Sequence, residues 1–124
     1  MSDDLLAAGR EVQAKLWPQT AGGGGGAFPA AKLAPDFFTY VAESAFGMIW
    51  SRPGLAIRDR SLVTVSQLAA LGKSEELKAH LRGALNVGLT KEELVEALMQ
   101  TAVYAGVPAA VEALRVAAEI LGTD

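Results

Sequence analysis

His80 is the only histidine of the chain and lies in the stretch 73–88, KSEELKAHLRGALNVG. Ser74 and the acids that follow it are typical of a helix start, and Gly88 is typical of a helix end. At about 100° per residue, His80 falls on the shoulder of an apolar stripe, one turn after Glu76. An imidazole in this setting could transfer a proton. A packed, hydrogen-bonded histidine fits the same pattern, and a first-turn acid commonly serves the helix dipole.

Five further residues could bind a substrate. Arg52, Arg58 and Arg60 lie within nine residues at the entry to an expected helix. Their planar guanidinium groups match a carboxylate and could clamp an acid. The alternative is a solvated loop whose arginines pair with neighbouring acids. Trp50 and Tyr104, near helix ends, could form pocket walls or belong to a core or an interface.

The composition excludes several kinds of site. The chain has no cysteine, so it has no disulfide, thiol nucleophile or thiolate metal site, and one histidine leaves little for a metal. The net charge of −3, with both signs interspersed, gives no basic patch for nucleic acid. Asp3 and Asp4 stand where a signal peptide would be basic, and no apolar run approaches about 18 residues. We therefore expect a soluble cytoplasmic protein without a metal, nucleic-acid or membrane partner.

Hydrophobic spacing and capping signals predict about six helices and an all-α fold. The expected helices cover residues 3–16, 35–50, 57–71, 74–88, 91–105 and 108–121. Thr90 and Glu93 form the capping box of one of them, whereas Gly9 weakens the first. The helix 57–71 is apolar on more than one side, which favours a central, wholly buried position.

The run Gly22–Gly26 lacks the helix start that a phosphate-binding loop requires, so we expect residues 22–29 to form a flexible loop. A length of 124 residues predicts a single domain over 1–124. The apolar fraction of 51% is more than one small core can hide, which predicts a homo-oligomer.

Four segments taken together resemble the carboxymuconolactone decarboxylase family: WSRPGL, RDRSLVT, HLRGALNVG and TAVYAGVPAA, in that order. The resemblance covers about residues 37–121 and extends loosely to GREV in the first helix. It implies an alkylhydroperoxidase D-like helical subunit in a ring-like hexamer. It also implies a cofactor-independent carboxy-lyase of bacterial aromatic catabolism. Such enzymes convert 4-carboxymuconolactone to the enol-lactone of β-ketoadipate and carbon dioxide.

A sister branch, the alkylhydroperoxidase D-like proteins, carries a Glu, a Cys-x-x-Cys pair and a His on the same helices. The corresponding positions here are Ser61, Lys73, Glu76 and His80. Only the histidine is kept. Thiol peroxidase chemistry is therefore excluded, because it needs a thiolate.

Loss of carbon dioxide from a carboxyl conjugated to a lactone carbonyl leaves an extended enolate, which needs charge stabilisation and one proton on carbon. We expect His80 to donate the proton and Glu76 to orient the ring or raise its pKa. The retained carboxylate would be held by one or more of three arginines, Arg52, Arg58 and Arg60. An apolar wall should face the leaving carboxylate, since an arginine there would stabilise the ground state. The candidates for this wall are Trp50, Leu81 and Tyr104.

Two other functions fit the same sequence. One is a cofactor-free tautomerase, cyclase or decarboxylase of another β-keto acid in the same fold. The other is a non-catalytic oligomeric binding module for a small acid. The sequence leaves open the natural substrate, the arginine that faces the pocket, the choice between trimer and hexamer, and whether subunits share a site.

Overall fold

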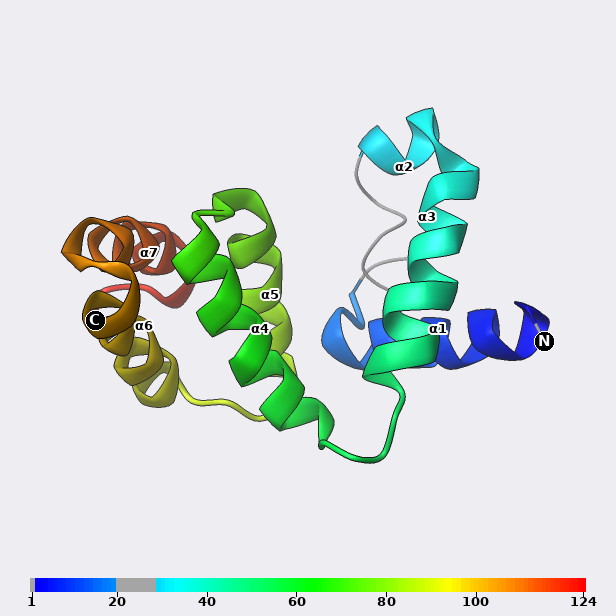
Figure 1. Cartoon of the computed structure of the whole chain (residues 1–124), viewed down its shortest axis with the longest axis horizontal. Coiled ribbons are helices and arrows are strands. Elements are labelled where there is room, and N and C mark those ends of the chain that lie inside the picture. The colour runs from blue at the N-terminus through cyan, green and yellow to red at the C-terminus, as the bar shows by residue number, and fades with distance from the viewer. Residues whose placement is uncertain (1, 20–28) are drawn as a thin grey trace. The chain divides into compact units, whose positions relative to one another are not determined.

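The computed structural model describes residues 2–19 and 29–124 (Figure 1). These residues form helices and no strand, which confirms the all-α prediction. They divide into two compact units, unit 1 up to Ile57 and unit 2 from Arg58. One domain over 1–124 stays a prediction. No described helix is both long enough and apolar enough to span a bilayer.

The described part of unit 1 consists of four helical segments, α1 (Ser2–Leu16), α2 (Pro29–Leu33), α3 (Pro35–Val41) and the π-helix η2 (Ala42–Trp50). The expected helix over 35–50 therefore has the right extent, but its second half is a π-helix. The wider turn persists at its end, where the N–H of Ser51 donates to the carbonyl of Phe46 at 3.1 Å. The short α2 was not predicted, although Pro29 suits a first helical position. The glycine run predicted to be flexible lies outside the described residues.

Two glycines explain how α1 crosses η2 (Figure 1). A Cβ atom on Gly9 would lie 1.9 Å from the carbonyl oxygen of Ala42, and one on Gly47 would lie 2.2 Å from that of Leu5. Any side chain at either position would force the two helix backbones apart. Gly9 weakens α1 as an isolated helix, but it makes this close crossing possible.

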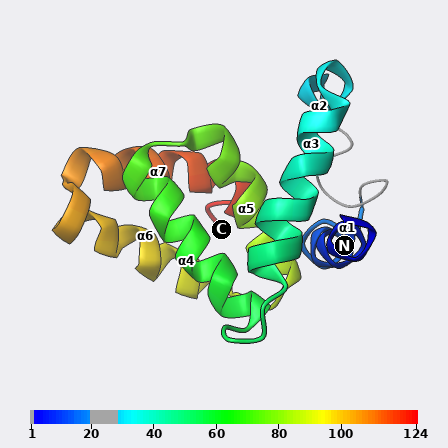
Figure 2. The same cartoon turned by 45° about the vertical axis from the view of Figure 1, so that its right-hand side comes forward.

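Unit 2 contains α4 (Ile57–Leu71), α5 (Ser74–Asn86), α6 (Lys91–Ala105) and α7 (Val107–Leu121) (Figure 2). The predicted capping box is present: the hydroxyl of Thr90 accepts from the N–H of Glu93 at 3.1 Å, and the Glu93 carboxylate accepts from the N–H of Thr90 at 2.9 Å. Gly106 turns the chain between α6 and α7 with a φ of 99°. The core of this unit draws on all four helices and on Leu89.

The helix α4 is not the wholly buried helix that its sequence suggested. It buries Ser61, Val65 and Ala69, but Val63 is 45% exposed and Leu71 is 69% exposed. A helix at the edge of a small bundle has neighbours on one side only, so its second apolar side lies on the surface.

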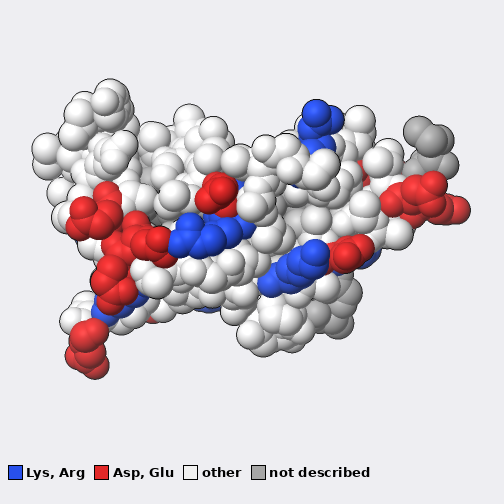
Figure 3. Space-filling model, turned by 90° about the horizontal axis from the view of Figure 1, so that it is seen from below, with Lys and Arg blue, Asp and Glu red and all other residues white. Residues whose placement is uncertain are grey.

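Basic and acidic side chains are interspersed on the face shown in Figure 3.

Candidate functional site

His80 lies on α5, on the helix face that enters the core of unit 2. Leu77, Leu81 and Ala84 on the same helix are buried. The imidazole itself is mostly shielded from solvent, and its Nδ1 atom is buried. This burial lowers the pKa of His80 from 6.5 to about 4, because a charged ring loses its hydration in an apolar setting. The ring is therefore neutral at pH 7.

Glu76, one turn before His80, is exposed. We expected it to orient the ring or to raise the pKa of His80. The raised pKa is wrong: burial lowers the pKa of the imidazole, and it is the cause of the shift. A carboxylate raises a histidine pKa only when it lies close to the ring, which an exposed side chain one turn away does not guarantee. The orienting role stays a prediction.

The three candidate arginines differ in their surroundings. Arg58 pairs with Glu93 of α6, and its guanidinium lies 3.9 Å from the carboxylate of Asp59. For Arg58 this agrees with the alternative in which the arginines pair with neighbouring acids. Arg60 is half-buried, with its Nε atom shielded from solvent. Arg52 is exposed and belongs to unit 1. Arg58 and Arg60 belong to unit 2, and the clamp remains a prediction for each.

The ion pair of Arg58 acts on a helix cap. The backbone N–H of Thr90 and, after it, the guanidinium of Arg58 lower the pKa of Glu93. The same carboxylate thus closes the capping box of α6 and ties that helix to the start of α4. A carboxylate substrate would have to compete with this acid for Arg58.

The three candidate wall residues have different environments. Leu81 is wholly buried in the core of unit 2, the place of a packing residue. Tyr104 is 86% exposed near the end of α6. Trp50 is half-buried at the end of η2 and stacks on Phe46, with ring centroids 5.7 Å apart.

At least two hollows on the described surface are open to small molecules. A groove of about 560 Å³ runs between α4 and α6 and has Tyr104 and Glu93 in its lining. A second hollow, of about 510 Å³, lies in unit 1 beside Trp50 and Arg52. The structure thus places two of the candidate residues at one hollow, whereas His80 lines neither.

Sequence reasoning missed two residues. Lys15 lines the hollow of unit 1, but a lysine in a last helical turn is indistinguishable from a partner of the helix dipole. Ser61 is wholly buried, and its hydroxyl has no hydrogen-bond partner among the described residues. A buried polar atom without a partner is uncommon, and the sequence marked this position only as the counterpart of the sister branch's Glu. No group of three or more His, Asp or Glu side chains in the described ranges could hold a metal ion.

The chain has recognisable relatives. Over 85 residues it is 46% identical to a 4-carboxymuconolactone decarboxylase of Acinetobacter baylyi, a match that covers 68% of this chain and 63% of that protein. Over 74 residues it is 42% identical to a nitrosuccinic acid decarboxylase of Metarhizium robertsii, covering 60% and 52%. An uncharacterised protein of Paracoccus denitrificans is 33% identical over 95 residues, covering 75% and 71%. The chain thus spans less than two thirds of either decarboxylase.

The chain matches the model of the carboxymuconolactone decarboxylase family from residue 35 to residue 119. These residues include all of α3, η2, α4, α5 and α6 and most of α7. They are more than half of the chain and contain the four segments that carried the resemblance. The chain belongs to the carboxymuconolactone decarboxylase family.

Proposed function

We propose that this chain is a cofactor-independent decarboxylase of a carboxylated lactone, with 4-carboxymuconolactone as its substrate and the enol-lactone of β-ketoadipate and carbon dioxide as its products. The observation that carries the proposal is the 46% identity to a protein named for this reaction. A second relative is named as a decarboxylase of a different acid. Loss of carbon dioxide is therefore the step that both names share.

The chemistry asks for a proton donor. When the bond to the leaving carboxylate breaks, its electron pair passes into the lactone as an extended enolate, and a proton must then be added to carbon. His80 is the proposed donor. Burial keeps its ring neutral at pH 7, but an anionic substrate beside the ring would raise the pKa of His80. The imidazole would thus gain a proton as substrate binds and pass it to carbon after carbon dioxide leaves.

The remaining roles are assigned by charge. Arg60 is a better candidate than Arg58 to hold the retained carboxylate, because it belongs to the same unit as His80 and Arg58 is engaged by Glu93. Glu76 would orient the imidazole. Of the three candidate wall residues, Tyr104 has the exposed surface to exclude water from the leaving carboxylate, whereas Leu81 is wholly buried in the core and Trp50 belongs to unit 1.

Exposed apolar side chains support assembly into a homo-oligomer, a trimer or a hexamer. Around the corner between α6 and α7, Val103 is 74% exposed, Tyr104 is 86% exposed and Val107 is 64% exposed. Large apolar side chains that are exposed close together are commonly covered by a partner. The cytoplasmic location stays a prediction.

A decarboxylation assay of the His80→Ala variant tests the proposal. Turnover of 4-carboxymuconolactone should fall about 10²–10⁴-fold, the usual contribution of a general acid. The far-ultraviolet circular dichroism should remain that of the parent protein. Carbon dioxide release at the parental rate by a folded variant would rule out His80 as the donor.

A second acid should be assayed beside the first, because the 42% identical relative is named for nitrosuccinic acid. Turnover of that acid alone would change the substrate and keep the reaction type. A non-catalytic binding module predicts turnover of neither acid. It would still be stabilised by an acid that it binds, by about 2.7 kcal/mol at a hundred times its Kd.

A further inference from the structure

We infer that the hollow of unit 1 is a binding site for a small organic carboxylate, with Lys15 and Arg52 as its cationic anchors. The inference rests on residues of unit 1 alone. It holds whether or not the chain is a decarboxylase, because binding at this hollow requires neither His80 nor turnover.

The hollow lies between the last two turns of α1 and the segment that leads from η2 to α4. Lys15 enters it from the last turn of α1, and Arg52 enters it from the segment after η2. Its volume of about 510 Å³ falls within the range of sites for small molecules. Two segments distant in sequence thus bring one cation each to the same concave surface.

The charges of the lining favour an anion. The charged side chains there are those of Glu11, Lys15 and Arg52, so the cations outnumber the acids by one. Glu11 lies 3.8 Å from the ammonium group of Lys15, and the two side chains are 73% and 59% exposed. An exposed pair at this separation contributes little. An incoming carboxylate can therefore replace Glu11 as the partner of Lys15.

The apolar part of the lining favours an organic anion over an inorganic one. Trp50 presents its ring to the hollow, and its position is set by the stack on Phe46. The buried Phe46 in turn forms a T-shaped contact with Trp17 at a centroid distance of 5.9 Å. Val12 and Leu55 complete an apolar surface beside the two cations. A carbon skeleton can pack on this surface while its carboxylate meets Lys15 and Arg52.

Tryptophan fluorescence can test the site. The chain has two tryptophans, so the Trp17→Phe variant leaves Trp50 as the reporter. Succinate, titrated into the full chain at constant ionic strength, should change the Trp50 emission saturably. Succinamide, which has the same skeleton without charge, should not. The inference is overturned if succinate gives no saturable change or if succinamide gives the same one.

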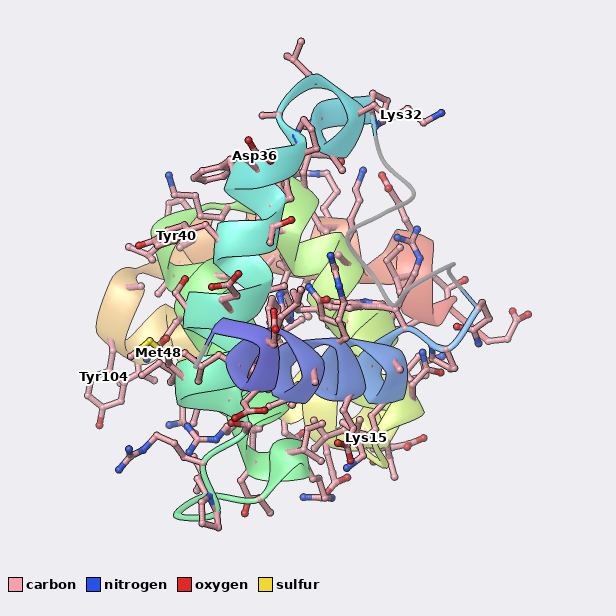
Figure 4. All side chains as sticks on the ribbon, turned by 90° about the vertical axis from the view of Figure 1, so that its right-hand side faces the viewer. Lys15, Lys32, Asp36, Tyr40, Met48 and Tyr104 are labelled. Carbon is pink, nitrogen blue, oxygen red and sulfur yellow. The ribbon has the colours of Figure 1, made fainter. Side chains whose placement is uncertain are left out.

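Three variants in the Trp17→Phe background assign the contacts. Lys15→Met should raise the Kd for succinate about three- to fivefold, as expected for a partly exposed ion pair. Glu11→Gln should lower that Kd by at least about twofold, since it removes the competing carboxylate. Lys32→Met is the matched control, because Lys32 is an exposed lysine of the same unit at the far end from Lys15 (Figure 4). Equal Kd values for Lys15→Met and Lys32→Met would refute the anchor.

The His80→Gln variant separates this inference from the proposed function. Loss of turnover with unchanged succinate binding supports both. Unchanged turnover with normal succinate binding would reject the catalytic role of His80 and leave the carboxylate site standing. Turnover in the parent protein without succinate binding would reject the site and leave the decarboxylase standing.

Discussion

The largely shielded imidazole of His80 should make the stability of the protein fall on mild acidification. Its pKa is about 4 in the folded chain, against 6.5 for an exposed histidine. Below pH 6.5 the unfolded chain therefore binds a proton that the folded chain does not. The free energy of unfolding consequently decreases as the pH falls. The stability contributed by the neutral ring is complete above pH 6.5 and is lost progressively down to about pH 4.

The size of the effect follows from the same two pKa values. Their difference of about 2.5, at 1.36 kcal/mol for each unit, gives a total loss of about 3 kcal/mol. About 2 kcal/mol of this loss falls between pH 7 and pH 5. Thr90 and Arg58 lower the pKa of Glu93 from its ordinary value of 4.5, so the stability that this carboxylate contributes is lost only as the pH falls below that value. The range from pH 7 to pH 5 is therefore dominated by His80.

Urea unfolding at pH 7 and pH 5, at one protein concentration, measures this loss. The parent protein should lose about 2 kcal/mol more than the His80→Gln variant, which has no group that titrates at this position. Comparison of the two proteins cancels the carboxylates common to both. Equal losses in parent and variant would show that the imidazole is hydrated in the folded chain, and the account of a neutral, buried His80 would fail.

Two further substitutions test the packing. Gly9→Ala should lower the free energy of unfolding by about 1–3 kcal/mol, because its Cβ would meet the Ala42 carbonyl. Ala14→Ser, at an exposed site of α1, is the control in urea unfolding. An equal effect of both substitutions would contradict the close crossing of α1 and η2. Ser61→Ala should leave the thermal midpoint unchanged or raise it, since it removes a buried hydroxyl without a partner among the described residues. A clear fall in the midpoint would show that this hydroxyl makes a hydrogen bond in the folded protein.

The ends of the helices could be predicted because the signals are local. The hydroxyl of Thr90 and the carboxylate of Glu93 satisfy N–H groups within one turn, and Gly106 and Gly122 adopt positive φ where a helix stops. The π-helix could not be predicted, since its wider turns need no special residue. The exposed second side of α4 was missed for a related reason: a sequence shows which faces are apolar but not which neighbour covers them.

The candidate site was harder to predict because its properties depend on distances between elements. Spacing placed His80 at the edge of an apolar stripe, and the structure buries most of it. The sign of its pKa shift did not follow from spacing, because Glu76 and burial act in opposite directions and only the fold decides which is larger. Arg58 shows the same limit: its partner Glu93 lies 35 residues later, on another helix. Lys15 is the clearest case, since it faces Arg52 across a hollow only when Gly9 and Gly47 let α1 lie directly on η2. The contact that binds the two helices therefore also determines where two cations meet.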